Sequence, residues 1–415
     1  MGHPALRADG AAHQHDPARG AAGARDPRSG PPRADRARHG PLRRRRRLRR
    51  PARARRGRRG GRGRRHRRTA AGDPAGPRRA ARGPGPARPR GAPDPALAPA
   101  RPREPGGRLV TGRDGAALGV SIVVPHYGDP APALVLLEQL RGQVGAPEHE
   151  ILVVDDASPL PFPAREGVVL VRRERNGGFG AAVNSGAARA AHPLLLVLNS
   201  DLEIGETFLR DLVAAGTPWL PAVVAPALRD GAGEPQWVGR RFPRLGHYVV
   251  EWLTPLARWR PRLRAAVGQD ARCVEGATLP VDWVIGAAML LPTDEFRAIG
   301  GFDESFHMNC EEVDLQRRLR ARGVPSVFTG GVVAVHAGGG SSDPARRLVW
   351  LLTARLRYAR KWRASPGALA ASLRAASVVN LGANAVRALA GRTVRPLATF
   401  RGELRLIAAA ETAAR

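Results

Sequence analysis

The chain has 415 residues, of which 43% are hydrophobic, enough for one large or two ordinary domains with an apolar core. Its formal net charge of +32 is unevenly distributed: the first hundred residues hold 29 arginines and six aspartates, with no lysine or glutamate. Lys361 is the single lysine, whereas a nucleic-acid-binding face uses lysine and arginine together as phosphate contacts. Binding of nucleic acid is therefore not expected, and an RNA- or lipid-binding N-terminal arm remains the alternative.

Residues 1–116 are rich in Arg, Pro, Gly and Ala and have no apolar periodicity, which predicts a disordered tail. Cys273 and Cys310 provide neither a disulfide framework nor a metal cluster, which suits a reducing compartment. The N-terminus lacks the apolar region of a signal peptide, and the chain has no uncharged apolar stretch of about 18 residues. We therefore expect a cytoplasmic protein.

From residue 117 onward, strand-like apolar runs alternate with helix-like patterns. The expected order is a strand and then a loop over 120–128, helix 131–143, strand 150–158 with its pair of acids, strand 167–176, a Gly-opened helix 177–191, strand 193–201 and helix 205–216. Such alternation with short loops predicts an α/β domain, a mostly parallel central sheet with helices on both faces.

Three of these strands end in polar residues. His126 and Tyr127 follow the first, Asp155 and Asp156 the second, and Asn199 to Asp201 the fourth. Ligands of open α/β sheets bind beyond the carboxyl ends of the strands. The sequence thus predicts one site at this edge, and the alternative is a set of ordinary turns and helix caps.

The second half adds a helix and a basic extension. The segment "EEVDLQRRLRARG" (311–323) opens with acids and closes with arginines before Gly323, as the helix dipole favours. Residues 344–415 place Leu, Trp and Tyr among arginines and predict basic amphipathic helices. These helices either contact a membrane surface or pack on the main domain with solvated arginines.

Seven motifs occur in the order seen in one enzyme family: "VSIVVPHYG", "EILVVDDAS", "NGGFGAAVNSG", "VLNSD", "VDWVIGAAMLL", "GGFDESFHMNCEEVDLQRRLRARG" and "VHAGGGSS". Over residues 117–343 the chain resembles the family 2 glycosyltransferases, and among them the rhamnosyltransferase-like members. The resemblance implies a GT-A fold (the nucleotide-diphospho-sugar transferase fold), a nucleotide-sugar donor, Mg²⁺ or Mn²⁺, and inversion at the anomeric carbon.

The resemblance also assigns residues to the metal and donor. A hard divalent cation would neutralise the diphosphate; Asp201, in the place of the family's Asp-x-Asp motif, and His336 would bind it. A helix cap is the alternative for residues 199–201. The donor site implied by the resemblance comprises Pro125, His126, Tyr127, Asp155, Asp156, Asn176, Gly178, Asn184, Asn199 and Asp201. Asp155 would accept the N3–H of uracil or thymine.

The same resemblance places the catalytic base at Glu312, which would take the proton of the acceptor hydroxyl. Glu311 would orient neighbouring groups and Asp314 would support the site, whereas the alternative is that these acids only stabilise the start of a helix. Asp282, Trp283 and Gly286 would shape the pocket for the sugar and acceptor.

The expected function is transfer of a sugar, with rhamnose preferred, from a dTDP- or UDP-linked donor to a cell-surface glycan or polyprenyl-diphosphate-linked acceptor. The enzyme would work in the cytoplasm, peripherally at the inner face of the plasma membrane if the basic helices contact lipid. The alternatives are galactofuranosyl or hexosaminyl transfer, a sugar nucleotidyltransferase, or nucleic-acid binding through the tail. The loop "VVPHYGDP" is not the Gly-rich, basic triphosphate loop expected of a nucleotidyltransferase.

Overall fold

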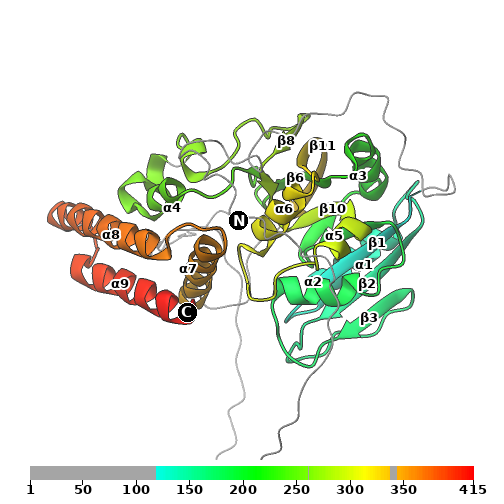
Figure 1. Cartoon of the computed structure of the whole chain (residues 1–415), viewed down its shortest axis with the longest axis horizontal. Coiled ribbons are helices and arrows are strands. Elements are labelled where there is room, and N and C mark those ends of the chain that lie inside the picture. Colours follow the sequence, from blue (N-terminus) through cyan, green and yellow to red (C-terminus); the bar gives the residue numbers. More distant parts are fainter. Residues whose placement is uncertain (1–117, 260, 337–343) are drawn as a thin grey trace, which may run out of the picture. The chain divides into compact units, whose positions relative to one another are not determined.

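The computed structural model describes residues 118–259, 261–336 and 344–415, so the predicted tail at 1–116 and the "AGGGSS" loop lie outside it. The first part runs β1 (Val120–His126), α1 (Ala131–Arg141), β2 (His149–Asp155), β3 (Val168–Arg172), α2 (Phe179–Ala187), β4 (Leu194–Leu198), β5 (Leu202–Ile204), α3 (Phe208–Gly216) and β6 (Val223–Arg229). The second part runs β7 (Gly239–Arg240), α4 (Leu245–Trp252), β8 (Thr278–Val281), β9 (Trp283–Val284), β10 (Ala288–Pro292), α5 (Thr293–Ala298), α6 (Glu311–Ala321), β11 (Ser326–His336), α7 (Pro344–Lys361), α8 (Pro366–Leu389) and α9 (Pro396–Ala413) (Figure 1).

The central sheet has the strand order β3-β2-β1-β4-β10-β6-β11-β5, with β8 also paired to β11. The predicted α/β fold is confirmed, and β3, β2, β1 and β4 are parallel as expected. Beyond β4 the sheet is mixed, because β10 runs antiparallel to both β4 and β6. The long connection between β6 and β10 also forms a two-stranded sheet of β7 and β9.

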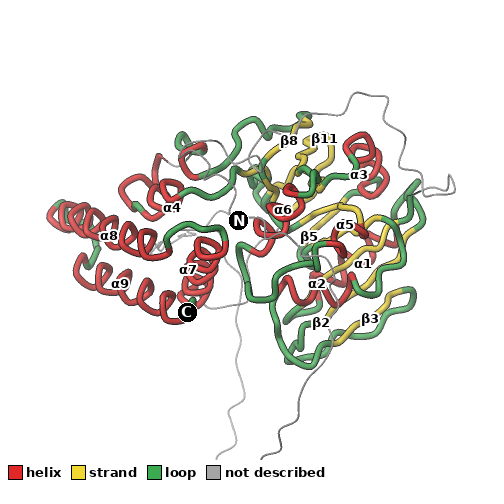
Figure 2. The backbone as a smooth tube through the Cα atoms, viewed as in Figure 1, coloured by secondary structure: helices red, strands yellow, loops and turns green. Residues whose placement is uncertain are grey.

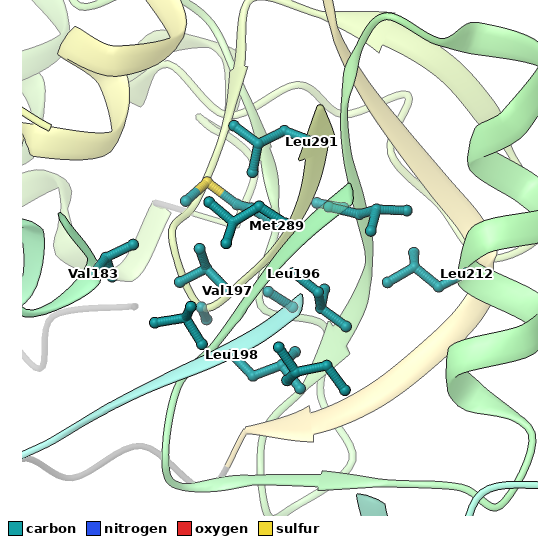
Figure 3. Close-up of a cluster of buried hydrophobic side chains, with 14 of the residues drawn as sticks. Val183, Leu196, Val197, Leu198, Leu212, Met289 and Leu291 are labelled. Atoms are coloured by element: carbon teal, nitrogen blue, oxygen red, sulfur yellow. The ribbon is translucent and has the colours of Figure 1, made fainter. Parts of the chain in front are cut away.

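The core lies on both faces of the central strands. All five residues of β4 are buried, and its Val197 pairs with Met289 of β10 (Figure 3). Helix α2 lies close to the sheet because its face is made of small residues: a β-carbon on Gly186 would lie 2.6 Å from Val123 Cγ1. This close packing positions the loops at both ends of α2 relative to the strand ends.

The carboxyl ends of the parallel strands meet as predicted. The register pairs His126, the last residue of β1, with Asp155, the last residue of β2. On the other side of β1, β4 ends at Leu198, immediately before Asn199. His336 closes β11 and pairs with Leu202 of β5, three residues beyond Asn199. Residues distant in sequence thereby reach one edge of the sheet.

The basic C-terminal segment forms the three long helices α7, α8 and α9 (Figure 2). The apolar side of α7 is buried: Leu352 and Leu356 pack with Leu373 of α8, Ile407 of α9 and Tyr248 of α4. Ala354 and Tyr358 of α7 belong to a second cluster with Phe242, Phe306 and Val313. Of the two alternatives, packing on the main domain therefore describes α7.

Candidate active site

His126 and Asp155 are enclosed at the ends of β1 and β2, being 3% and 0% exposed. Asp155 Oδ1 accepts the Ser158 N–H (2.8 Å), and Oδ2 accepts the Phe162 N–H (2.9 Å) and a bond from Arg172. Burial alone would raise the pKa of Asp155, but these bonds and the Arg172 charge bring it below its usual value. Asp155 is therefore an ionised group that holds the loop after β2.

The His126 ring packs edge-on against Phe162, at 4.9 Å between centroids. Neither ring nitrogen has a hydrogen-bond partner among the described residues, and burial lowers the pKa of this histidine. Tyr127, the next residue, is half exposed, and Pro125 is partly buried. Of these three, Tyr127 is the one whose side chain is open to a ligand from solvent.

Asp156 organises the Gly-rich turn before α2. Its carboxylate accepts N–H groups from Gly177 (3.0 Å) and Gly178 (2.7 Å) and pairs with Arg173 (2.8 Å). Gly178 was assigned to the donor site, and here the amides of Gly177 and Gly178 point at Asp156. Asn176, just before the turn, is exposed. Gly178 has φ of 87°, and a β-carbon there would lie 1.8 Å from His307 O, so this position requires glycine.

Asn184 was assigned to the donor site, and the structure gives its side chain a different contact. Its amide donates to Phe302 O and Glu304 Oε1, both at 3.0 Å, and its Oδ1 accepts the Phe302 N–H at 2.8 Å. Asn184 thus fastens the loop that precedes α6 to α2. The reason is geometric: on this helix it faces Gly301, where a β-carbon would lie 2.4 Å from Asn184 Oδ1.

Asn199, Asp201 and His336 lie together. His336 Nε2 is 3.1 Å from Asn199 Nδ2 and 3.3 Å from Asp201 Oδ1. Gln236, which the sequence analysis did not identify, binds His336 on its other side: Gln236 Nε2 donates to His336 O (2.7 Å), and Oε1 faces Nδ1 at 2.7 Å. This pattern places the proton on Nδ1, so that the lone pair of Nε2 accepts the Asn199 Nδ2–H, with Asp201 Oδ1 beside it.

No three His, Cys, Asp or Glu side chains within the described ranges are arranged to hold a metal ion by themselves. The Asp201–His336 pair still offers one carboxylate oxygen and one imidazole nitrogen that face each other. His336 is 1% exposed and Asp201 about one third exposed, so the pair opens on the Asp201 side. The donor set suits a divalent cation whose remaining ligands come from a phosphate or water.

The acidic start of α6 follows a strained turn. Asn309 and Cys310 both have positive φ, 71° and 65°, which non-glycine residues rarely adopt. Glu311 and Glu312 then begin the helix, and one oxygen of each (Oε2) is buried without a hydrogen-bond partner in the described part of the chain. Unsatisfied buried carboxylate oxygens are costly, and such groups mark a site that awaits a ligand or proton.

The two glutamates have different proton affinities. Burial, then the negative charge of Glu312, raises the pKa of Glu311 well above the usual value. Burial also raises the pKa of Glu312, and the charge of Arg240 opposes that shift. Since Glu312 has this positive neighbour and Glu311 does not, Glu312 is the first of the pair to ionise as the pH rises.

The Gly286–Ala287 turn contacts both the helix that carries the two glutamates and the segment that carries Asn199. A β-carbon on Gly286 would lie 3.5 Å from Glu312 Cβ, and the next residue, Ala287, accepts the Asn199 N–H at 2.8 Å. Gln316 of α6, also missed by the sequence analysis, donates to Val284 O (2.7 Å) and accepts its N–H (2.8 Å). The helix bearing the glutamates is therefore fixed to the turn that contacts the Asn199 segment.

Asp314 binds the end of α7 and the residue after it, not the two glutamates. It is fully buried and binds Arg318 Nε (2.9 Å), Lys361 Nζ (2.8 Å) and Trp362 Nε1 (3.0 Å). Asp314 was predicted to support the site, and its position on α6 turns it toward the end of α7. With three charge-assisted or N–H donors, the carboxylate is satisfied.

Asp282 and Trp283, predicted in the sugar pocket, hold the segment around Arg240. Asp282 Oδ2 accepts the Phe242 N–H (2.9 Å), and Asp282 Oδ1 lies 3.7 Å from Arg320 Nη1. Trp283 Nε1 donates to Arg241 O (2.9 Å), and its ring faces the Arg240 guanidinium at 6.0 Å. Their contacts bring Arg240, which sequence reasoning missed, near the glutamate pair.

Residues 121–255 match the family model "Glycosyl transferase family 2". The chain is 28% identical over 234 residues, 52% of this chain and 71% of the relative, to the N-acetylglucosaminyl-diphospho-decaprenol L-rhamnosyltransferase of Mycobacterium tuberculosis (strain ATCC 25618 / H37Rv). It is 30% identical over 225 residues, 50% of this chain and 49% of the relative, to validoxylamine A glucosyltransferase of Streptomyces hygroscopicus subsp. limoneus. The family model and these relatives identify a glycosyltransferase. Over residues 121–255 the chain is thus similar to the family 2 glycosyltransferases, and its relatives include rhamnosyltransferases.

Among solved structures, the mannosyltransferase PcManGT from Pyrobaculum calidifontis, in complex with GDP-Man and Mn²⁺, aligns with a TM-score of 0.41 and 14% identity over 72% of this chain and 89% of that chain. GalNAc-T7 with UDP, GalNAc and Mn²⁺ aligns with a TM-score of 0.41 and 16% identity over 59% of this chain and 48% of that chain. Within residues 118–259, 261–336 and 344–415, no helix has the length and apolar character needed to cross a bilayer.

Proposed function

We propose that the protein is an inverting, divalent-metal-dependent glycosyltransferase that moves rhamnose from a dTDP- or UDP-linked donor to a polyprenyl-diphosphate-linked glycan. One observation carries the proposal: Asn199, which belongs to the Asp201–His336 cluster, and Glu312 adjoin the same Gly286–Ala287 turn. The group proposed to bind the leaving diphosphate and the group proposed to accept a proton therefore adjoin one turn, an arrangement that supports transfer to a hydroxyl.

Asp201 and His336 would hold Mg²⁺ or Mn²⁺. The ion would supply positive charge to neutralise the diphosphate that leaves with the nucleotide. Gln236 keeps the His336 ring in the tautomer that presents Nε2. Because the chain contributes a single carboxylate here, we expect the ion to bind together with the nucleotide, whose phosphate oxygens complete its ligands.

Glu312 would accept the proton of the attacking acceptor hydroxyl. It is the member of the glutamate pair that ionises first, because Arg240 lowers its pKa relative to burial alone. Glu311, protonated over a wider pH range, would donate a hydrogen bond to the acceptor or to Glu312. A base whose pKa is raised toward the working pH transfers protons more effectively than an ordinary carboxylate.

The nucleoside is proposed to bind beside Tyr127, the exposed residue after β1. Asp155 is 0% exposed and already accepts bonds from Ser158, Phe162 and Arg172, so recognition of a uracil or thymine N3–H requires the Ser158–Phe162 loop to move aside. Asp282, Trp283 and Gly286 would shape the pocket indirectly, by placing Arg240 and Glu312. Galactofuranosyl or hexosaminyl transfer remains the second candidate, because the same pocket residues would surround those sugars.

The experiment is a donor screen with purified protein. Thermal shift with dTDP-rhamnose, UDP-galactofuranose and UDP-N-acetylglucosamine is measured with and without Mn²⁺, followed by transfer to a water-soluble analogue of a diphosphate-linked N-acetylglucosamine. Stabilisation and transfer with dTDP-rhamnose only when Mn²⁺ is present supports the proposal. Transfer that persists in a chelator contradicts the metal requirement. Transfer from another donor, and not from dTDP-rhamnose, contradicts rhamnose as the transferred sugar.

A further inference from the structure

Large apolar side chains are exposed where α8 turns into α9. Val386, Leu389 and Leu397 are 66%, 89% and 60% exposed. Elsewhere on the same helices, Leu373 and Ile407 are buried in the bundle. The exposed side chains are therefore not the ones that hold the helices together. We call residues 386–397 the hairpin tip.

The apolar surface continues along α8. Val378 and Val379 are 58% and 55% exposed, and Val379 precedes Val386 by two helical turns, on the same face of the helix. Scattered exposed apolar residues are common, but a contiguous set on one helix face and the adjoining turn indicates a surface that contacts something apolar.

The charged residues in the segment that forms this surface are all arginines. The segment 377–402 contains Arg387, Arg392, Arg395 and Arg401, all exposed, and no Asp or Glu in its sequence. The next acid, Glu403, is 4% exposed and bound to Asn380 inside the bundle. Apolar side chains surrounded by arginines match the interface of an anionic bilayer, where acyl chains lie beneath phosphates.

We propose that the hairpin tip docks on an anionic lipid surface, with Val386, Leu389 and Leu397 entering the headgroup region and the three tip arginines contacting phosphates. This inference rests on the proposed function in one respect, since a lipid-linked acceptor is reached at such a surface. A second copy of the chain would face the tip with the same positive charge, which disfavours a symmetric dimer here. Residues 1–100, with 29 arginines and six aspartates, carry the same sign of charge as the tip.

The test measures sedimentation of the full chain with vesicles of phosphatidylcholine, alone or mixed with phosphatidylglycerol. We expect binding to the mixed vesicles. Leu389→Asp should weaken it about tenfold or more. Arg392→Ser with Arg395→Ser should weaken it about 25-fold, from roughly fivefold for each arginine. High salt should reduce binding of the wild-type protein.

Matched controls carry the same chemical changes at exposed positions elsewhere. They are Leu160→Asp, where the leucine is 65% exposed, and Arg165→Ser with Arg189→Ser. The controls should bind vesicles as the wild-type protein does, and circular dichroism should be unchanged in every variant. Equal binding by tip and control variants overturns the proposal, as does a shift from dimer to monomer in Leu389→Asp.

Transfer to the water-soluble acceptor separates this inference from the proposed function. The tip variants should retain that activity, because the hairpin tip lies outside the site built from Asp201, His336 and Glu312. A wild-type protein that binds mixed vesicles without transferring sugar refutes the proposed function alone. A wild-type protein that transfers sugar but ignores the vesicles refutes the docking surface alone.

Discussion

Trp362 donates its indole N–H to Asp314 Oδ1 at 3.0 Å, so the residue after α7 is bonded to the helix that carries the glutamate pair. Lys361 binds the other oxygen of the same carboxylate at 2.8 Å. The C-terminal helices are thus connected to the candidate active site through one fully buried charge.

Replacing this charge should destabilise the whole described fold. Asp314→Asn removes the carboxylate paired with Arg318 and one of the two carboxylates paired with Lys361, and we expect the free energy of unfolding to fall by about 3 kcal/mol. Asp303→Asn is the control: Asp303 also pairs with Lys361 but is about one third exposed, so its loss should cost less than about 1 kcal/mol. Urea unfolding measures both, and equal losses would contradict the anchoring role.

The assignment of Glu312 as base predicts a large kinetic effect with intact binding. Glu312→Gln should lower kcat by roughly 10²- to 10⁴-fold, while the affinity for the donor changes little. The pH profile gives an independent check. Since the base acts when ionised and its pKa is raised, the rate should rise through a pH range above that of an ordinary glutamate.

Arg240→Gln should move that rising limb to higher pH, because Arg240 favours the ionised form of Glu312. Arg241→Gln, next in sequence, is the control and should leave the limb in place. A profile unaffected by Arg240→Gln would show that the limb belongs to another group.

Glu311 offers a prediction about stability. Its pKa is raised in the folded state, so the folded protein binds more protons than the unfolded one above about pH 4. Stability therefore decreases as pH rises from there through the folded pKa. Glu311→Gln removes this loss, so its Tm should exceed the wild-type value near neutral pH and approach it in acid. Thermal melts across pH measure the difference, and a constant difference contradicts burial of an ionisable pair.

Gln236 should act on metal affinity through His336. Gln236→Leu removes the partner of His336 Nδ1 and should weaken Mn²⁺ binding, measured by calorimetry with dTDP present, by about 10- to 100-fold. Gln143→Leu also removes a glutamine bonded to backbone groups, those of Gly205 and Leu209, and should leave Mn²⁺ affinity unchanged. Loss of affinity in both variants would indicate general unfolding instead.

Gly178 and Gly167 make a matched pair for backbone strain. Both have positive φ, 87° and 70°, but a β-carbon at Gly178 meets His307 O at 1.8 Å, whereas at Gly167 nothing described lies within 4 Å. Gly167→Ala should cost about 1 kcal/mol. Gly178→Ala should cost several times more and reduce turnover, because the His307 segment leads into α6. Similar Tm values for the two would contradict this close approach.

The sequence predicted the strand ends well because a parallel sheet brings them together by topology. His126, Asp155 and Asn199 needed only the alternation of strands and helices to be placed at one edge. The residues that bind these segments were harder to predict from the sequence. Gln236 lies in a long connection and Gln316 inside a helix, where no local pattern distinguishes a hydrogen-bonded glutamine from a solvated one. The roles assigned to Asn184 and Asp314 differed because the facing direction of a helical side chain depends on its tertiary neighbours.

The turn formed by Asn309 and Cys310 restricts the backbone directions that are open to the start of α6. Left-handed backbone at two successive residues with side chains costs about 1 to 2 kcal/mol for each, a cost that glycine would avoid. Glycine would also let the peptide before α6 sample many directions. By keeping bulkier residues there, the protein accepts a less stable fold in return for a narrower range of backbone directions just before Glu311 and Glu312.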